Sequence, residues 1–152
     1  MIKVLIMDDE PLATELVSEY LADFPQFEIQ KVCHDGFEGL KAIQEHKPDL
    51  IFLDIQMPGL NGFEVLTQLD EIPEIIFTTA YDNFWMNAFE TNGIEYLLKP
   101  FSKERFKKAW DKFTILNTAN STDQSLLTNL SKLIEQTITP KLYKKRFTIH
   151  TY

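Results

Sequence analysis

The chain has 152 residues, and 44% of them are hydrophobic, which is enough for the core of one ordinary domain with a short appendage. It has no apolar run near the roughly 18 residues of a membrane span, no signal-peptide pattern and one cysteine, so we expect no membrane segment, no internal disulfide and a cytoplasmic location. The net charge of −8 is unevenly distributed. Residues 1–115 have 10 basic and 21 acidic side chains, a net charge of −11, whereas residues 116–152 have 5 basic and 2 acidic side chains, a net charge of +3. The acidic first part would therefore repel DNA phosphates.

The first predicted strand, KVLIM at residues 3–7, is continuously apolar after its lysine, as expected for a strand covered on both faces. It runs directly into Asp8, Asp9 and Glu10, whose carboxylates repel one another. Glu10 and Pro11 favour the start of a helix, because acidic side chains and proline are both favourable in a first turn. The end of this strand is nevertheless a costly place for three adjacent charges, which calls for an explanation.

Four more apolar runs follow, and amphipathic segments separate them. The run FEIQKVC at residues 27–33 alternates, which suits a strand nearer an edge, and Asp35 after it is interpreted as a turn residue. Gly59 and Gly62 permit a tight loop after the third strand. The predicted strands cover residues 3–7, 27–33, 49–54, 74–79 and 94–98, and the predicted helices cover residues 11–24, 37–46, 62–70, 82–91 and 102–117. This alternation predicts an α/β fold with a doubly wound, five-stranded parallel sheet.

The pattern changes near residue 117, so we expect the first domain to cover residues 1–117. Residues 118–141 are interpreted as a linker with an amphipathic helix at 125–138, whose Leu/Ile stripe either pairs with a second copy or packs back on its own domain. Residues 142–152 contain RFTIHTY, which alternates like a single strand and cannot fold alone. We therefore expect residues 142–152 to begin another domain.

Polar side chains stand at the predicted ends of four strands. In a doubly wound sheet, ligands bind outside the carboxyl ends of the strands, where the strand order switches. With strand order 2-1-3-4-5, this edge gathers Asp8, Asp9, Asp54, Thr79 and Lys99. The set offers oxygen ligands for a hard divalent cation, a balancing positive charge and a hydroxyl donor.

Each of these residues alone has a simpler interpretation. Adjacent acids after a strand often belong to a solvated loop or a helix cap, and Asp54 could cap the helix that follows it. Thr79 could satisfy its own backbone, and Lys99 could be an ordinary surface charge. Their joint placement at the ends of successive strands favours a common site.

The segments DDEP, LDIQMPGLNG, TTAYD and YLLKPF, in this order and spacing, resemble the receiver domain of two-component response regulators. The stretch FTTAYDNFWMNAFETNGIEYLLKPF is similar to receivers of LytTR-type (LytR/AlgR) regulators in particular. The tail LYKKRFTIHTY is compatible with the start of a LytTR DNA-binding domain. The resemblance implies the flavodoxin-like receiver fold over residues 1–117.

The resemblance also implies phosphoryl transfer from a sensor histidine kinase to Asp54 with Mg²⁺ as the cofactor. In the family, the metal is held directly by the residues matching Asp9 and Asp54, through water by that matching Asp8, and by the backbone carbonyl of Gln56. Thr79 and Lys99 would each bind a phosphoryl oxygen. These roles are expectations for this chain.

Further expectations concern the signal and its lifetime. By resemblance, Thr79 and Tyr96 form the switch, and Pro100 follows a cis peptide bond. Tyr81 and Gln56 should flank the path of an attacking water, so a bulky Tyr81 would slow hydrolysis. The family further implies homodimerisation on activation, and transcription control by DNA binding through a domain beyond this chain.

Two other functions use the same residues. A phosphatase-like hydrolase with an aspartate nucleophile usually has a second aspartate two residues later, where this chain has Gln56. A receiver-like protein that only binds would not need the complete set of acids, threonine and lysine. Both alternatives therefore rank below the signalling function.

Overall fold

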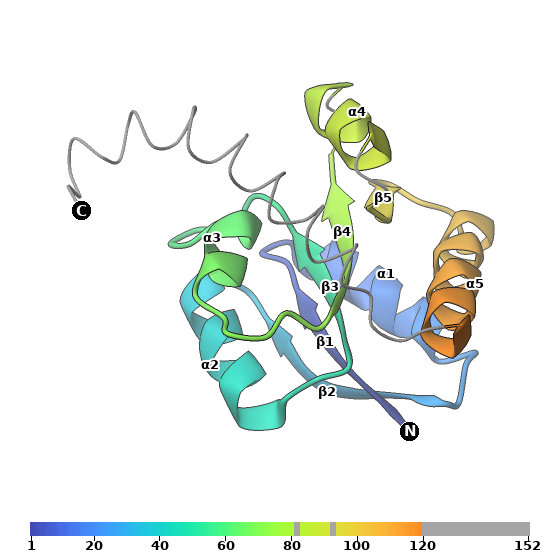
Figure 1. The fold of residues 1–152 in the computed structure, drawn as a ribbon, viewed down its shortest axis with the longest axis horizontal. Helices are drawn as coiled ribbons and strands as arrows, with labels where there is room; N and C mark the ends of the chain where they lie inside the picture. The colour runs from blue at the N-terminus through green and yellow to red at the C-terminus, as the bar shows by residue number, and fades with distance from the viewer. Residues whose placement is uncertain (81–82, 92–93, 120–152) are drawn as a thin grey trace.

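Helices and strands alternate strictly along the chain (Figure 1). The computed structural model describes residues 1–80, 83–91 and 94–119. Its elements are β1 Ile2–Met7, α1 Pro11–Leu21, β2 Phe27–Cys33, α2 Gly36–His46, β3 Leu50–Asp54, α3 Gly62–Thr67, β4 Glu74–Thr79, α4 Asn83–Thr91, β5 Tyr96–Leu98 and α5 Lys103–Ala119. The five strands form one parallel sheet in the order β2-β1-β3-β4-β5, which confirms the predicted fold class.

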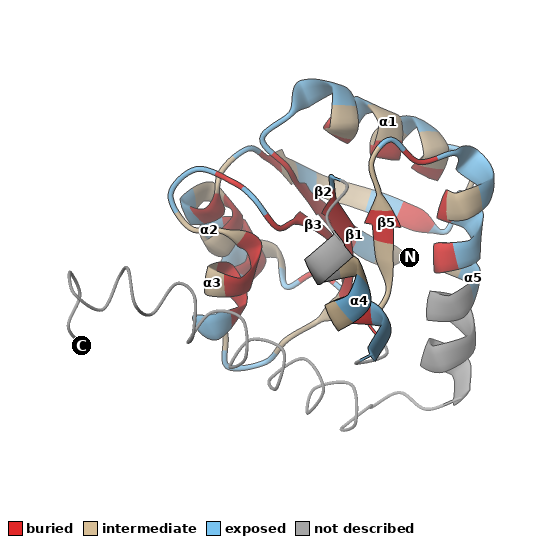
Figure 2. Ribbon diagram, turned by 90° about the horizontal axis from the view of Figure 1, so that it is seen from above, coloured by how far each residue is buried: buried red, intermediate tan, exposed pale blue. Residues whose placement is uncertain are grey.

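Side chains alternate between the two faces of the sheet and form two separate cores. Leu5 and Met7 of β1 belong to the core that packs against α2, α3 and α4, whereas Val4 and Ile6 belong to the core against α1 and α5. Figure 2 shows the buried residues gathered on the strands and on the inner sides of the helices. Because both faces are covered, the central strand β3 is buried throughout, whereas the edge strands β2 and β5 mix buried with partly exposed residues.

The ends of several helices differ from the prediction. Helix α1 ends at Leu21 rather than at residue 24, because Phe24 precedes Pro25 and a residue before proline disfavours helical backbone. Helix α3 ends at Thr67 rather than at residue 70. Asp35 was expected to be a turn residue, but it is the N-cap of α2, where its carboxylate accepts a hydrogen bond of 2.8 Å from the Glu38 amide.

The loop after β3 is held tightly against the strand end. Gly59 adopts a φ of +81°, a backbone conformation that favours glycine. A Cβ atom at Gly62 would lie 2.6 Å from the Asp54 carbonyl oxygen, so α3 begins in close contact with the backbone of Asp54. Asn61 and Glu64 close a capping box at the same helix start. The surroundings of Asp54 are thereby fixed on this side.

Within the part of the chain that the structure describes, no helix is both long and apolar enough to cross a membrane. Helix α5 extends to Ala119, two residues into the linker predicted at 118–141. The rest of that linker, residues 120–141, and the predicted start of another domain at residues 142–152 lie outside the described residues. Both remain predictions.

Candidate phosphoryl-acceptor site

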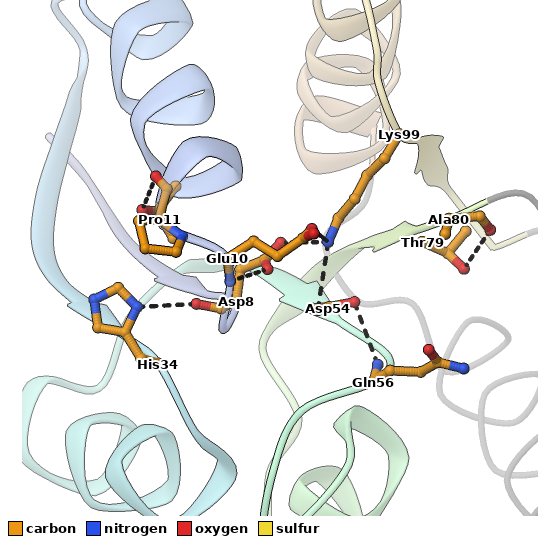
Figure 3. A network of polar contacts seen from close by, with 10 residues as sticks. Asp8, Glu10, Pro11, His34, Asp54, Gln56, Thr79, Ala80 and Lys99 are labelled. Atoms are coloured by element: carbon orange, nitrogen blue, oxygen red, sulfur yellow. Dashed lines mark hydrogen bonds and ion pairs between the residues drawn. The ribbon is translucent and has the colours of Figure 1, made fainter.

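The polar strand ends meet at one edge of the sheet (Figure 3). Asp8 and Asp9 follow β1, Asp54 is the last residue of β3, Thr79 is the last residue of β4, and Lys99 follows β5. Strand β3 pairs with both β1 and β4, so the ends of β1 and β4 flank Asp54. The structure therefore brings these elements together as the strand order predicted.

Three carboxylates converge at this edge. One oxygen atom each of Asp8, Asp9 and Asp54 lies within 4.8 Å of the others. Asp8 and Asp54 are buried, whereas Asp9 is exposed. Oxygen atoms that cluster in this way match the ligand preference of a hard divalent cation. The carboxylates outnumber the neighbouring lysine, so the cluster has an excess of negative charge that a cation would balance.

Lys99 reaches into the carboxylates from β5. Its Nζ atom lies 2.8 Å from Asp8 Oδ2 and 3.4 Å from Asp54 Oδ2. A third carboxylate oxygen, Glu10 Oε1, lies 3.0 Å from the same ammonium. The Lys99 amide also donates a hydrogen bond of 2.7 Å to the Thr79 carbonyl, which fixes β5 beside β4. The peptide bond between Lys99 and Pro100 is cis, as the resemblance implied.

The charges of Asp54 and Lys99 depend on this proximity. Burial, followed by the negative charge of Asp8, raises the pKa of Asp54 from 3.8 to about 7, although Lys99 opposes the rise. Burial alone would lower the pKa of Lys99, but the hydrogen bond to Asp8 and the charge of Asp54 outweigh it and raise the pKa. Lys99 is thus always charged near neutral pH, and a further cation would favour the ionised form of Asp54.

Backbone groups orient the buried acids. The Glu10 amide donates a hydrogen bond of 2.9 Å to Asp8 Oδ1, and the Gln56 amide donates one of 3.2 Å to Asp54 Oδ1. The His34 ring atom Nδ1 lies 3.1 Å from the Asp8 carbonyl oxygen, within hydrogen-bond distance. In Figure 3 the side chain of Gln56 extends away from Asp54. The observed contact of Gln56 with Asp54 is thus made by its backbone amide, and the metal-ligand role that the resemblance implies for its carbonyl stays a prediction.

Thr79 lies at the edge but does not face Asp54. Its hydroxyl donates a hydrogen bond of 3.0 Å to the Ala80 carbonyl (Figure 3). The alternation of side chains along a strand explains why Thr79 and Asp54 point to different faces of the sheet. Thr79 comes two residues after Phe77, which belongs to the core beside α4, whereas Asp54 comes two residues after Phe52, which belongs to the core beside α1 and α5.

Tyr96 is half-buried at the start of β5 and is held from two sides. Its hydroxyl donates a hydrogen bond of 2.8 Å to Glu90 Oε2, which raises the pKa of Tyr96. The Arg105 guanidinium lies 5.7 Å from the centre of its ring and donates a hydrogen bond of 2.7 Å to its carbonyl. The ring also packs against Phe89. Tyr81, the remaining predicted site residue, lies outside the described residues.

Sequence reasoning missed two features of this edge. Glu10 was assigned to the start of α1 alone, but its side chain reaches Lys99. Thr78, in register with Asp54, is buried, and among the described residues its hydroxyl has no hydrogen-bond partner. The position of Glu10 next to the two aspartates was a weak sequence signal of its contact with Lys99. The two adjacent threonines at the end of β4 gave no signal that the Thr78 hydroxyl would be buried without a partner.

A doubly wound sheet with clustered carboxylates and a lysine at its strand ends is the arrangement of a receiver domain. The response regulator receiver domain family matches residues 4–111, and the chain belongs to this family. It is therefore a signalling domain of a two-component response regulator.

Individual relatives agree with this assignment. An uncharacterized response regulatory protein of Vibrio cholerae is 43% identical over 133 residues, which cover 86% of this chain and 55% of that protein. The transcriptional regulatory protein BtsR of Escherichia coli is 44% identical over 110 residues, or 71% of this chain and 46% of that protein. The chain thus spans about half the length of the curated relatives it matches.

A solved structure has the same fold. The response regulatory domain of protein mrkE from Klebsiella pneumoniae superposes with a TM-score of 0.67 at 35% identity, over 78% of this chain and 99% of that domain. The match supports the receiver fold and its sheet order.

Proposed function

We propose that Asp54 accepts a phosphoryl group from the phosphohistidine of a sensor histidine kinase, in a reaction that depends on Mg²⁺. The observation that carries the proposal is the buried Asp54 carboxylate, placed at a strand end beside two further aspartates and 3.4 Å from a lysine ammonium. This combination supplies a nucleophile together with the positive charge that phosphoryl transfer needs.

Asp8, Asp9 and Asp54 are the residues that would hold the metal ion, with the Gln56 carbonyl as a further ligand. Their clustered oxygen atoms fit a hard cation, and such a cation would oppose the burial and the Asp8 charge that raise the pKa of Asp54. When bound, Mg²⁺ neutralises negative charge on the carboxylates and on the phosphoryl group. Asp9 is the exposed member, so it faces the side from which an ion arrives.

In the transfer step, an ionised oxygen of Asp54 attacks the phosphorus atom. The bond from phosphorus to the histidine nitrogen breaks, and the imidazole leaves with the electron pair, so that Asp54 becomes an acyl phosphate. Lys99 Nζ, already 3.4 Å from Asp54 Oδ2, pairs with an oxygen of the incoming group. Thr79 can donate to another oxygen only if its hydroxyl leaves the Ala80 carbonyl.

We further propose that Thr79 and Tyr96 carry the signal to the surface formed by α4, β5 and α5. Movement of the Thr79 hydroxyl toward the phosphoryl group would leave space beside it, into which the Tyr96 ring could turn once it leaves Glu90. The two residues lie on neighbouring strands, since Phe77 pairs with Tyr96 and Thr79 pairs with Leu98. This surface would then drive homodimerisation.

The output proposed for the longer protein is control of transcription. This rests on the relative described as a transcriptional regulatory protein and on the LytTR-like stretch at residues 77–101. DNA binding would belong to a domain beyond this chain, because residues 1–115 are strongly acidic.

The test is to incubate the chain with Mg²⁺ and a small phosphodonor such as acetyl phosphate. We expect one acid-stable, base-labile phosphate per chain, abolished by Asp54→Asn and by chelation of the metal. Asp70→Asn, which removes an exposed aspartate after α3, is the control and should label normally. Rapid turnover of the donor would instead favour the hydrolase, and absence of label would favour a binding-only domain.

A further inference from the structure

Glu10 is the carboxylate at this edge whose position the proposed function does not explain. It is the N-cap residue of α1, yet among the described residues its side chain forms no capping hydrogen bond with that helix. Instead Glu10 Oε1 lies 3.0 Å from Lys99 Nζ, across 89 positions of sequence. Figure 3 shows the Glu10 side chain extended past Asp8 toward the ammonium.

We propose that Glu10 is a positioning residue that occupies Lys99 in the unphosphorylated domain and is displaced by the phosphoryl group. The inference rests on the proposed function and deepens it, because it assigns to this chain a built-in competitor for the phosphoryl-binding lysine.

The hydrogen-bonding capacity of Lys99 supports this role. An ammonium has three N–H donors, and a phosphoryl group on Asp54 adds oxygen atoms that also require donors. In the structure the ammonium already faces three carboxylate oxygens, from Asp8, Glu10 and Asp54. The two nearer oxygens, from Asp8 and Glu10, would therefore compete with a phosphoryl oxygen for Lys99.

Exposure decides which partner is released. The Glu10 side chain is 61% exposed, whereas those of Asp8 and Asp54 are 5% and 6% exposed. Water can replace Lys99 around the exposed Glu10 at little cost, whereas it reaches the buried Asp8 poorly, so the loss of the lysine costs more at Asp8. Glu10 is consequently the partner that leaves, and Asp8 keeps Lys99 at the site throughout.

The competition for Lys99 predicts how removal of the Glu10 charge changes the affinity for a phosphoryl analogue. Glu10→Gln weakens the resting ion pair and keeps the side-chain length, so the phosphorylated form should gain relative to the resting form. Exposed ion pairs contribute little, which sets the expected gain in affinity for a phosphoryl analogue at about two- to fivefold. General repulsion between Glu10 and an anionic ligand would act in the same direction and must be separated from competition for Lys99.

The experiment measures the binding of beryllium trifluoride, a noncovalent analogue of the phosphoryl group, at saturating Mg²⁺ by NMR titration. The variants are Glu10→Gln and Glu15→Gln, the latter removing an exposed charge farther along α1. The ¹⁵N signal of the Lys99 ammonium is followed as a direct readout of its partners.

We expect tighter binding for Glu10→Gln only, and a Lys99 signal in the unliganded variant that is shifted toward that of the liganded wild type. Equal or weaker binding by Glu10→Gln, or the same gain in Glu15→Gln, would overturn the inference while leaving the proposed function intact. A wild-type chain that does not bind the analogue at all would overturn the proposed function and the inference together.

Discussion

Lys99 lies closer to Asp8 than to Asp54, with its Nζ atom 2.8 Å from Asp8 Oδ2 and 3.4 Å from Asp54 Oδ2. The lysine is therefore anchored by the residue beside the proposed nucleophile rather than by the nucleophile. An oxygen atom of Asp54 is thus within reach of Lys99, but the main partner of Lys99 is Asp8.

Replacement of Lys99 by methionine should destabilise the fold, because it leaves two buried carboxylates without their cation. We expect Lys99→Met to lower the free energy of unfolding by about 2–3 kcal/mol at pH 8, measured by urea denaturation without divalent cations. The loss should be smaller at pH 5, where Asp54 is protonated. Lys41→Met, at an exposed site on α2, is the control. An equal loss in the two variants would contradict the proposed anchoring.

Asp54 should also make stability depend on pH. Its folded-state pKa of about 7 exceeds the ordinary 3.8, so the folded chain holds this proton more tightly than the unfolded chain between these pH values. The contribution of Asp54 to stability therefore falls as pH rises from about 4 to about 7.

This dependence can be isolated by comparison with Asp54→Asn, which cannot ionise. Without divalent cations, the variant should gain stability over the wild type between pH 5 and pH 8, as measured by urea denaturation. A difference that stays constant over this range would show that the pKa of Asp54 is ordinary.

Magnesium should stabilise the folded chain through the exposed Asp9 as well as through the buried acids. We expect the melting temperature to rise with Mg²⁺ concentration, since a ligand that binds only the folded state stabilises it. Asp9→Asn should leave the metal-free melting temperature nearly unchanged and raise the Mg²⁺ concentration for half of the shift, on the order of tenfold. Glu15→Gln should retain the wild-type response, and a normal response by Asp9→Asn would remove Asp9 from the ligand set.

Tyr96 should be needed for the response to phosphorylation but not for phosphorylation itself. Tyr96→Ala removes the contacts with Glu90 and Arg105 far from the carboxylates, so it should label with acetyl phosphate like the wild type. The change in the amide NMR signals of α5 on phosphorylation should be lost. A full response in α5 without the Tyr96 ring would contradict the proposed switch.

Thr78 predicts an unusual gain of stability. Its buried hydroxyl has no hydrogen-bond partner among the described residues, so Thr78→Val should be stabilising by up to about 1 kcal/mol. Thr14 is a matched contrast, because it is also buried but its hydroxyl donates a hydrogen bond of 2.9 Å to the Pro11 carbonyl. Thr14→Val should be destabilising in the same urea titration. Destabilisation by Thr78→Val would reveal a partner for its hydroxyl, such as a buried water molecule.

The fold could be predicted from the sequence because a strand buried on both faces is a continuous run of apolar residues, which can be recognised in the sequence. Strand β3 is apolar throughout until Asp54, and β2 alternates because it lies at an edge. Helix ends were less predictable. Asp35 resembles an ordinary turn residue until the position of the Glu38 amide is known.

The site was predicted in its composition but not in its contacts. The strand ends identify Asp8, Asp54 and Lys99, because strand order alone brings them to one edge. The position of Glu10 depends on the direction in which α1 leaves β1, which no local pattern encodes. The turn of the Thr79 hydroxyl toward Ala80 depends likewise on a side-chain rotation that sequence does not specify.

The opposite directions of Asp54 and Thr79 have a consequence for how the two layers of the molecule communicate. Asp54 extends the face of the sheet that packs against α1 and α5, and Thr79 extends the face that packs against α4. A phosphoryl group attached to the first and held by the second would join these faces around the end of the sheet. A single covalent modification would then link two hydrophobic cores that the sheet otherwise separates.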